Sequence, residues 1–115
     1  MSISIELFGK KLNTPLIPAS GVWGYGDEYD FVNNESIGAF CTKGLSVRPK
    51  EGNPVPRITE TECGVLNSVG LQNIGIRKFI DEKIPKIKEL GPKIIVNFFG
   101  NTEQEYIEAA QMLDS

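Results

Sequence analysis

Hydrophobic residues along the chain group into short runs that predict strands and into one long stretch with helical spacing. Residues 38–43 and 93–99 are nearly continuous apolar runs, as in parallel strands that are covered on both faces. Between them, residues 74–90 place apolar side chains at helical spacing, and Pro85 is expected to weaken that helix or end its first segment. A strand, a helix and a second strand in this order are typical of a parallel sheet with helical crossovers.

Further elements are predicted on either side of this unit. Residues 3–7 and 11–13 flank a Gly-Lys pair and predict a short hairpin, and residues 15–20 form a short apolar run. An acidic pair begins a predicted short helix at about 27–34, and residues 102–113 predict another helix that starts with a capping-box sequence. The order of hairpin, β, α, β, α, β, α predicts an α/β fold.

Two stretches before the helix at 74–90 have no regular period. Residues 44–63 are rich in proline, which excludes a helix and predicts a long connector. Residues 64–73, Gly-Val-Leu-Asn-Ser-Val-Gly-Leu-Gln-Asn, combine two glycines with three side-chain amides. Glycine lets a backbone approach a ligand closely, and amides both donate and accept hydrogen bonds. This loop is therefore either a binding segment for a small heterocycle or only a connector.

Polar side chains lie where three of the apolar runs end. Ser20, Lys43 and Asn97 are each at or near the carboxyl end of a predicted strand, the edge where ligands bind in barrels and open α/β sheets. Each also has a plainer explanation: Lys43 could extend to solvent, Asn97 could bond to a neighbouring backbone, and Ser20 could open a loop. Their occurrence together favours a ligand site.

Composition narrows the classes of function. The 115 residues carry 12 basic and 15 acidic side chains, a net charge of -3, so a nucleic-acid partner is not expected. The apolar runs are too short for a transmembrane helix and the amino terminus lacks the layout of a signal peptide, so a cytoplasmic protein is the simplest interpretation. The chain has no histidine and no Cys-x-x-Cys pair, so no metal site is expected and acid–base catalysis by histidine is excluded within it.

The cysteines and the aromatic loop are weaker candidates. No histidine is present to activate Cys63, so we expect it to be a small buried side chain and Cys41 to lie in the core. Trp23 and Tyr25 could cover a planar ligand or pack beneath the rim of the sheet. Three parallel strands would leave two open edges, and we therefore expect this chain to be part of something larger.

Five segments in order resemble the dihydroorotate dehydrogenases, the flavoenzymes of pyrimidine biosynthesis. The most specific are Gly-Asn-Pro-Val-Pro-Arg at 52–57 and Leu-Asn-Ser-Val-Gly-Leu-Gln-Asn at 66–73, and the others are residues 13–21, residues 42–49 and Val96-Asn97. The resemblance implies a (β/α)8 TIM barrel that binds FMN above its carboxyl rim and oxidises (S)-dihydroorotate to orotate. Residues 1–115 would form the N-terminal hairpin and first three βα units of that single domain, because a full barrel needs about 250 residues.

The resemblance also assigns roles to residues of this chain. It implies that Ser20, Lys43 and Gly44 contact FMN, that Asn97 contacts FMN or orotate, and that the charge of Lys43 stabilises the reduced, anionic flavin. It implies that Lys43 also contacts the substrate, together with a segment that lines the orotate site: Asn67, Ser68, Val69, Gly70 and Leu71. The catalytic base of class 1 enzymes is a cysteine after the fourth strand. That position lies beyond Ser115, so no catalytic residue is expected here and this chain alone is expected to be inactive.

The sequence Gly-Leu-Gln-Asn at 70–73 is most like the NAD-linked class 1B catalytic subunit, since related class 1A enzymes tend to have proline in place of the glutamine. Class 1B implies a partner subunit that carries FAD and a [2Fe-2S] cluster and passes electrons to NAD+, and a homodimer at the core of a heterotetramer. Two alternatives stay open. One is a related flavin barrel, such as the pyrimidine domain of dihydropyrimidine dehydrogenase, and the other is a non-catalytic half-barrel that assembles with another chain.

Overall fold

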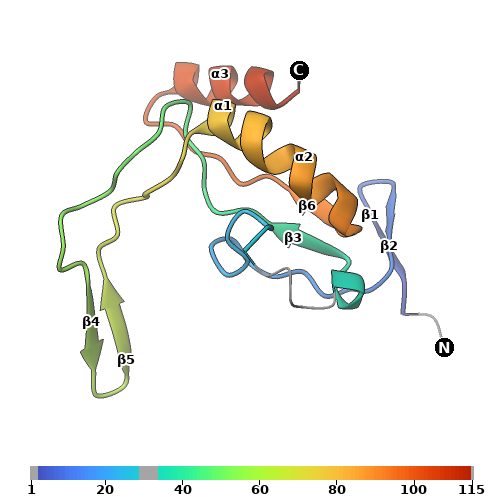
Figure 1. Ribbon diagram of the computed structural model, residues 1–115, viewed down its shortest axis with the longest axis horizontal. Coiled ribbons are helices and arrows are strands. Elements are labelled where there is room, and N and C mark those ends of the chain that lie inside the picture. Colours follow the sequence, from blue (N-terminus) through green and yellow to red (C-terminus); the bar gives the residue numbers. More distant parts are fainter. Residues whose placement is uncertain (1–2, 29–33, 115) are drawn as a thin grey trace.

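A computed structural model describes residues 3–28 and 34–114 and shows an α/β chain made of short elements (Figure 1). The strands are β1 (Ile5–Leu7), β2 (Lys10–Leu12), β3 (Ala39–Cys41), β4 (Ile58–Thr61), β5 (Gly64–Asn67) and β6 (Lys93–Ile95). The helices are the 3-10 turn η1 (Asn34–Ser36), α1 (Ile76–Lys78), the π-helix η2 (Phe79–Lys83), α2 (Ile84–Ile87), the 3-10 turn η3 (Lys88–Leu90) and α3 (Glu103–Leu113).

Strands β3 and β6 pair in parallel, which confirms the central prediction. Phe40 lies opposite Ile94 and Cys41 opposite Ile95. The pairing continues past the ends of both strands, because Leu45 donates a hydrogen bond to the Asn97 carbonyl (3.0 Å) and accepts one in turn from the backbone N–H of Phe99 (2.8 Å). The runs predicted at 38–43 and 93–99 therefore do lie side by side, although the regular strands within them are shorter.

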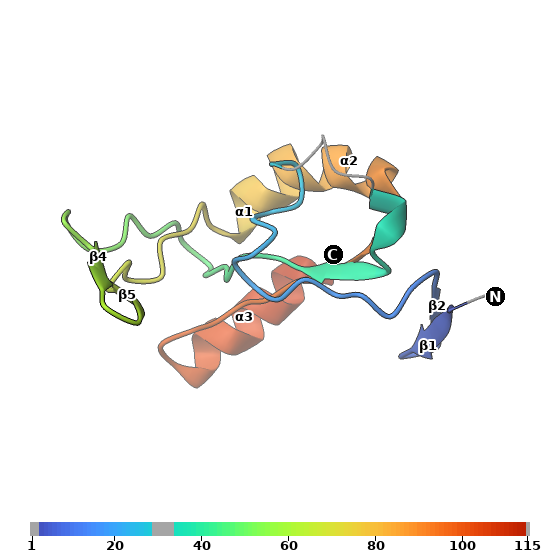
Figure 2. The ribbon, with the colours of Figure 1, turned by 90° about the horizontal axis from the view of Figure 1, so that it is seen from below.

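The core lies between this strand pair and the helices. Phe40 from β3 packs with Phe79 and Ile87 from the helical segment, and Ala109 of α3 completes the cluster; all four are fully buried or nearly so. Figure 2 shows α1, α2 and α3 flanking the strands, and α1 contacts α3 directly. Side chains alternate between the faces of a strand, so Cys41, Ile95 and Asn97 belong to the other face. Cys41 and Ile95 there are half-buried and Asn97 is exposed.

The segment predicted as one helix at 74–90 is helical but irregular, as Pro85 leads us to expect. Proline has no N–H to donate and its ring crowds the preceding turn. The chain widens into the π-helix η2 just before Pro85, which sits in the first turn of α2. The turn η3 then closes the segment at Gly91, which has φ 97°, a conformation suited to glycine.

Helix α3 begins as its capping sequence predicts. The Thr102 hydroxyl accepts a hydrogen bond from the backbone N–H of Glu105 (3.2 Å). The Glu105 carboxylate returns to accept the backbone N–H of Asn101 (2.6 Å), one residue before the cap. The Thr102 hydroxyl therefore satisfies an N–H group that the first helical turn leaves open, and the Glu105 carboxylate fixes the residue that precedes the cap.

The amino-terminal prediction is confirmed in part. Strands β1 and β2 form the expected antiparallel hairpin. Residues 15–20, whose end was expected to be a strand end, form no strand because Pro15 and Pro18 have no N–H to complete a ladder. The segment still lies beside β3, since Gly38 and Cys41 donate hydrogen bonds to its carbonyls. Most of the helix predicted at 27–34 falls on residues outside those that the structure describes.

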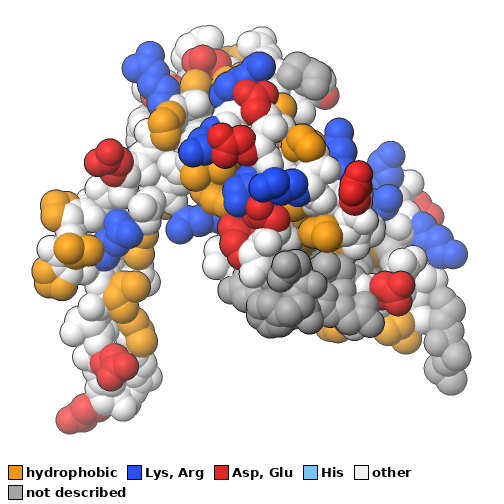
Figure 3. All heavy atoms as spheres, in the orientation of Figure 1, with side chains coloured by type: hydrophobic (Ala, Val, Ile, Leu, Met, Phe, Trp, Pro, Cys, Tyr) orange, Lys and Arg blue, Asp and Glu red, His pale blue; other side chains and the backbone are white. Residues whose placement is uncertain are grey.

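The hairpin of β4 and β5 was not predicted, and it corrects the interpretation of residues 44–73 as connector and loop. Its strands pair antiparallel and extend away from β3 and β6 (Figure 1). Hydrophobic side chains are exposed along it, including Ile58, Val65 and Leu66 (Figure 3). The prediction that Cys63 is buried is wrong, because Cys63 lies in the exposed turn of this hairpin.

Candidate functional site

Two of the three predicted strand-end residues are in direct contact. The Asn97 amide donates to the Ser20 hydroxyl (2.7 Å), and that hydroxyl donates to the carbonyl of Thr42 (2.8 Å). The side-chain hydroxyl of Thr42 accepts the backbone N–H of Asn97 (3.1 Å). Three segments that are far apart in the sequence thus end in one closed ring of hydrogen bonds.

Lys43 and Gly44 follow directly on this ring. The backbone N–H of Lys43 donates to the Gly24 carbonyl (2.7 Å), which ties the strand end to the glycine-rich loop. A Cβ atom added to Gly44 would meet Asn97 and Phe99 only at 3.5 Å, which is ordinary contact. Packing within the described chain therefore does not require glycine at 44.

A hollow of about 740 Å³ joins Lys43 to the second predicted group. Its lining includes Tyr25, Lys43 and Lys50, and it also includes Gln72 and Asn73 from the end of the amide-rich segment. Asn73 is buried, and its side-chain amide donates a hydrogen bond to the Ser46 hydroxyl, near the start of the connector (2.9 Å). Of the residues predicted to bind substrate, only Lys43 lines this hollow, and residues 67–71 lie outside its lining.

The rest of that segment, residues 67–71, is held by the proline-rich motif at 52–57. The Asn53 amide donates to the Ser68 carbonyl (2.9 Å) and to its hydroxyl (3.0 Å), and the Asn53 backbone N–H donates to the Val69 carbonyl (3.0 Å). The Arg57 guanidinium donates to the side-chain oxygen of Gln72 (2.7 Å). The two most specific sequence motifs are therefore folded against each other.

The backbone at Gly70 and Leu71 adopts left-handed conformations, with φ of 79° and 57°. A Cβ at Gly70 would lie 2.7 Å from Asn53, so only glycine fits. The left-handed conformation of Leu71 costs strain on the order of 1–3 kcal/mol. Leu71 is also 58% exposed. Asn67 is also exposed, and within residues 3–28 and 34–114 its side-chain amide has no hydrogen-bond partner. These residues present polar and apolar groups outward rather than to the core.

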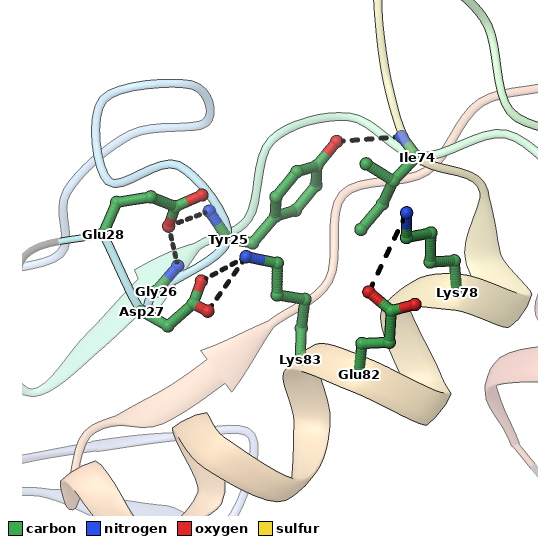
Figure 4. A network of polar contacts seen from close by, with 8 residues as sticks. All are labelled: Tyr25, Gly26, Asp27, Glu28, Ile74, Lys78, Glu82 and Lys83. Carbon is green, nitrogen blue, oxygen red and sulfur yellow. Dashed lines mark hydrogen bonds and ion pairs between the residues drawn. The ribbon is translucent and has the colours of Figure 1, made fainter.

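A polar network fixes the loop that leads from Ser20 towards β3 (Figure 4). The Lys83 ammonium, on the helical segment, donates to both carboxylate oxygens of Asp27 at 2.7 and 2.9 Å. The Glu28 carboxylate accepts the backbone N–H groups of Tyr25 (2.8 Å) and Gly26 (3.0 Å). The Tyr25 hydroxyl accepts the backbone N–H of Ile74 (3.2 Å), next to the amide-rich segment. Tyr25 thus joins the loop to the residue that directly follows the amide-rich segment.

The ion pair in this network is partly buried, with side chains 18% and 21% exposed. Burial by itself would raise the pKa of Asp27, but the hydrogen bond and charge of Lys83 outweigh it and hold that pKa below its ordinary value. Burial would likewise lower the pKa of Lys83, and Asp27 reverses that and raises it. Burial raises the pKa of Tyr25, which stays a neutral phenol at physiological pH. Of the two roles open for Tyr25, the packing one is observed, since its ring lies 6.0 Å from that of Phe79.

This network was not found from the sequence. Asp27 and Lys83 are 56 positions apart, and nothing in the local pattern at either residue pairs them.

The hairpin of β4 and β5 did carry a signal in the sequence, because Ile58, Thr59, Thr61 and Val65 are β-branched and flank a short polar turn.

The family follows from comparison with known proteins. A family model described as "Dihydroorotate dehydrogenase" matches residues 2–115, almost the whole chain. The chain belongs to the dihydroorotate dehydrogenase family. Among curated relatives, the chain is 52% identical over 113 residues to "Dihydroorotate dehydrogenase B (NAD(+)), catalytic subunit" of Geobacter sulfurreducens and 54% identical to the protein of the same name from Geobacter metallireducens. Each match covers 97% of this chain and 37% of the relative.

A third dihydroorotate dehydrogenase B catalytic subunit, from Trichlorobacter lovleyi, is 50% identical over 115 residues. The chain thus spans little more than a third of the length of the family members it matches. Among solved structures, the dihydroorotate dehydrogenase of Eimeria tenella in complex with ferulenol superposes with a TM-score of 0.57. That match covers 96% of this chain and 33% of that one at 16% identity, so it supports the fold alone.

No helix within residues 3–28 and 34–114 is long and apolar enough to cross a membrane. The same ranges contain no cluster of three or more Cys, Asp or Glu side chains that could hold a metal ion.

Proposed function

We propose that the protein to which these residues belong oxidises (S)-dihydroorotate to orotate with FMN. The observation that carries this proposal is the 50–54% identity to three NAD-linked catalytic subunits, which extends across both predicted binding segments. The dihydropyrimidine dehydrogenase type of barrel is the less favoured alternative, because none of these three relatives carries that name.

The strand-end residues fit a flavin. Ser20 and Asn97 offer a hydroxyl and an amide at the edge of a face that no described element covers, and Lys43 adds a positive charge. We assign Ser20, Lys43, Gly44 and Asn97 to FMN, which when bound would accept the hydride from the substrate. The ammonium of Lys43 would then favour the negatively charged reduced form, since opposite charges a few ångströms apart attract strongly where water is excluded.

We assign the substrate to Lys43 and to residues 67–71. Orotate is a flat, anionic ring with both donors and acceptors, and it needs partners of both kinds. The free amide of Asn67 and the exposed backbone near Gly70 supply them, while Lys43 supplies a counter-charge. No cysteine in this chain is assigned as the base: Cys63 lies in the exposed hairpin turn and Cys41 on β3.

The arrangement supports residues 1–115 as the N-terminal part of one TIM-barrel domain. The radius of gyration is 15.8 Å, against about 13 Å for a compact domain of roughly this size. Apolar side chains at Phe8, Leu16 and Val55 are 58–90% exposed. Further βα units would cover such groups and the open face of β3 and β6. We further propose a cytoplasmic homodimer that pairs with a subunit carrying FAD and [2Fe-2S], which passes electrons to NAD+.

The test uses protein expressed from its own gene at its natural length. Intact mass and a visible spectrum are recorded first, and dihydroorotate oxidation is then followed with an artificial acceptor and, once the partner subunit is added, with NAD+. Bound flavin with dihydroorotate-dependent reduction supports the proposal. A preparation that carries FMN but reduces it with dihydrouracil and not with dihydroorotate would favour the alternative barrel. A flavin-free chain that only self-associates would favour the non-catalytic assembly.

A further inference from the structure

Thr42 is the residue around which the Ser20–Asn97 contact is built. Its side chain is fully buried, and both of its oxygens are used. The backbone carbonyl accepts the Ser20 hydroxyl (2.8 Å), and the side-chain hydroxyl accepts the backbone N–H of Asn97 (3.1 Å). Its own N–H donates to Ile95 (2.9 Å), so Thr42 is fixed to β6 on one side and to residue 20 on the other.

The protons in this ring determine which way the Asn97 amide points. A serine hydroxyl has one proton, and Ser20 gives it to the Thr42 carbonyl. The Ser20 oxygen can therefore only accept from Asn97, and its partner at 2.7 Å must be the NH2 group of the amide. A flipped amide would place two acceptors against each other. The side-chain carbonyl oxygen of Asn97 must then face away from Ser20.

That carbonyl oxygen has no partner among the residues that the structure describes, and Asn97 is exposed on the uncovered face of β3 and β6. The ring thus turns an ambiguous side chain, able to donate or accept, into an acceptor of fixed direction. An acceptor that is already held in place binds a hydrogen-bond donor without the entropic cost of ordering its side chain. The imide N–H of a flavin ring is a donor of this kind.

We propose that Thr42 is a positioning residue, which holds Asn97 so that its carbonyl oxygen accepts the imide N–H of the bound flavin. The inference rests on the proposed function, because it takes the flavin as the ligand. Thr42 itself does not touch the ligand in this proposal. Its backbone carbonyl accepts the Ser20 proton, and its hydroxyl fixes the backbone N–H of Asn97.

The test compares the binding of FMN with that of 3-methyl-FMN, in which a methyl group replaces the imide proton, to the flavin-free natural-length protein. Thr42→Val keeps the shape and removes the hydroxyl, Thr42→Ser keeps the hydroxyl, and Asn97→Ala removes the acceptor. Urea unfolding of each variant shows whether it is folded. The expected result is that the wild type prefers FMN by about tenfold or more, the worth of one good hydrogen bond.

Thr42→Val removes the acceptor that fixes the backbone N–H of Asn97, so residue 97 can shift, and it should lose most of that preference, as should Asn97→Ala; Thr42→Ser should keep it. A preference that is equal in the wild type, Thr42→Val and Asn97→Ala would overturn the inference and leave the proposed function standing. A wild-type protein that binds neither flavin would overturn both. If Thr42→Val fails to fold, Ser20→Ala frees the same amide and must show the same loss of preference.

Discussion

Replacing Lys83 with methionine tests the network that holds the loop after Ser20. Methionine keeps most of the length and apolar surface of the lysine stem while removing its charge. Asp27 would then be left as a carboxylate that is 18% exposed and has lost the two hydrogen bonds from the ammonium. Exposed ion pairs contribute about 0.2–1 kcal/mol, whereas breaking a fully buried one costs about 3–5 kcal/mol. For a pair about one-fifth exposed, we expect Lys83→Met to lower the free energy of unfolding by about 1–3 kcal/mol.

The assay is urea unfolding of the wild type, Lys83→Met, Asp27→Asn and the double variant, each at neutral pH. The double-mutant cycle isolates the pairwise energy, which we expect to be at least about 1 kcal/mol. The exposed pair of Lys78 and Glu82, at 3.9 Å, is the matched control and should give a coupling near zero. A coupling between Lys83 and Asp27 no larger than that control would refute the reasoning.

The pH dependence gives a second check on the same pair. The pKa of Asp27 is lowered in the folded protein, so its contribution is present above the unfolded value near 4 and is lost as pH falls through the folded pKa. The pKa of Lys83 is raised, so its contribution is present below its ordinary value and is lost as pH rises through the folded pKa. The stability difference between wild type and Lys83→Met should therefore be constant around neutral pH and shrink at both extremes. A difference that persists well below the folded pKa of Asp27 would exclude an electrostatic cause.

Two further substitutions test the assigned binding segments. Lys43→Met removes the charge that would favour reduced flavin, so it should lower the midpoint potential of the bound flavin by about 30 mV or more, which is about 1.4 kcal/mol for two electrons. Lys50→Met, in the same hollow, should leave the potential unchanged. An unchanged potential in Lys43→Met would remove the proposed role of that charge. Gly70→Ala should raise KM for dihydroorotate at least several-fold, because the new Cβ would lie 2.7 Å from Asn53, whereas Gly64→Ala meets no atom within 4 Å. Equal KM values for the two alanine variants would show that the shape of the segment does not matter for substrate.

The features that could be predicted from sequence depend on local or periodic interactions. The apolar runs at 38–43 and 93–99 indicated a covered parallel pair, and β3 and β6 form it. The capping of α3 follows from Thr102 and Glu105, which are three residues apart. Ser20 and Asn97 come together because carboxyl ends of neighbouring parallel segments meet at one edge, a consequence of topology rather than of either residue.

The features that were missed depend on contacts between distant residues or on exposed surface. The hairpin of β4 and β5 buries neither of its faces in the described chain, so it lacks the one-sided apolar alternation that reveals most strands. The pairing of Asp27 with Lys83 exists only once the loop meets the helical segment. The roles of Asn53 and Arg57 as supports for residues 67–72 likewise appear only when the two motifs are folded together.

The most direct test of the central claim is an anaerobic titration of the natural-length, flavin-containing protein with dihydroorotate, followed by its visible absorbance. We expect the absorbance of the oxidised flavin to bleach in proportion to added dihydroorotate, with orotate formed in equal amount, and to recover when an electron acceptor is admitted. Flavin that stays oxidised in the presence of excess dihydroorotate would contradict the account.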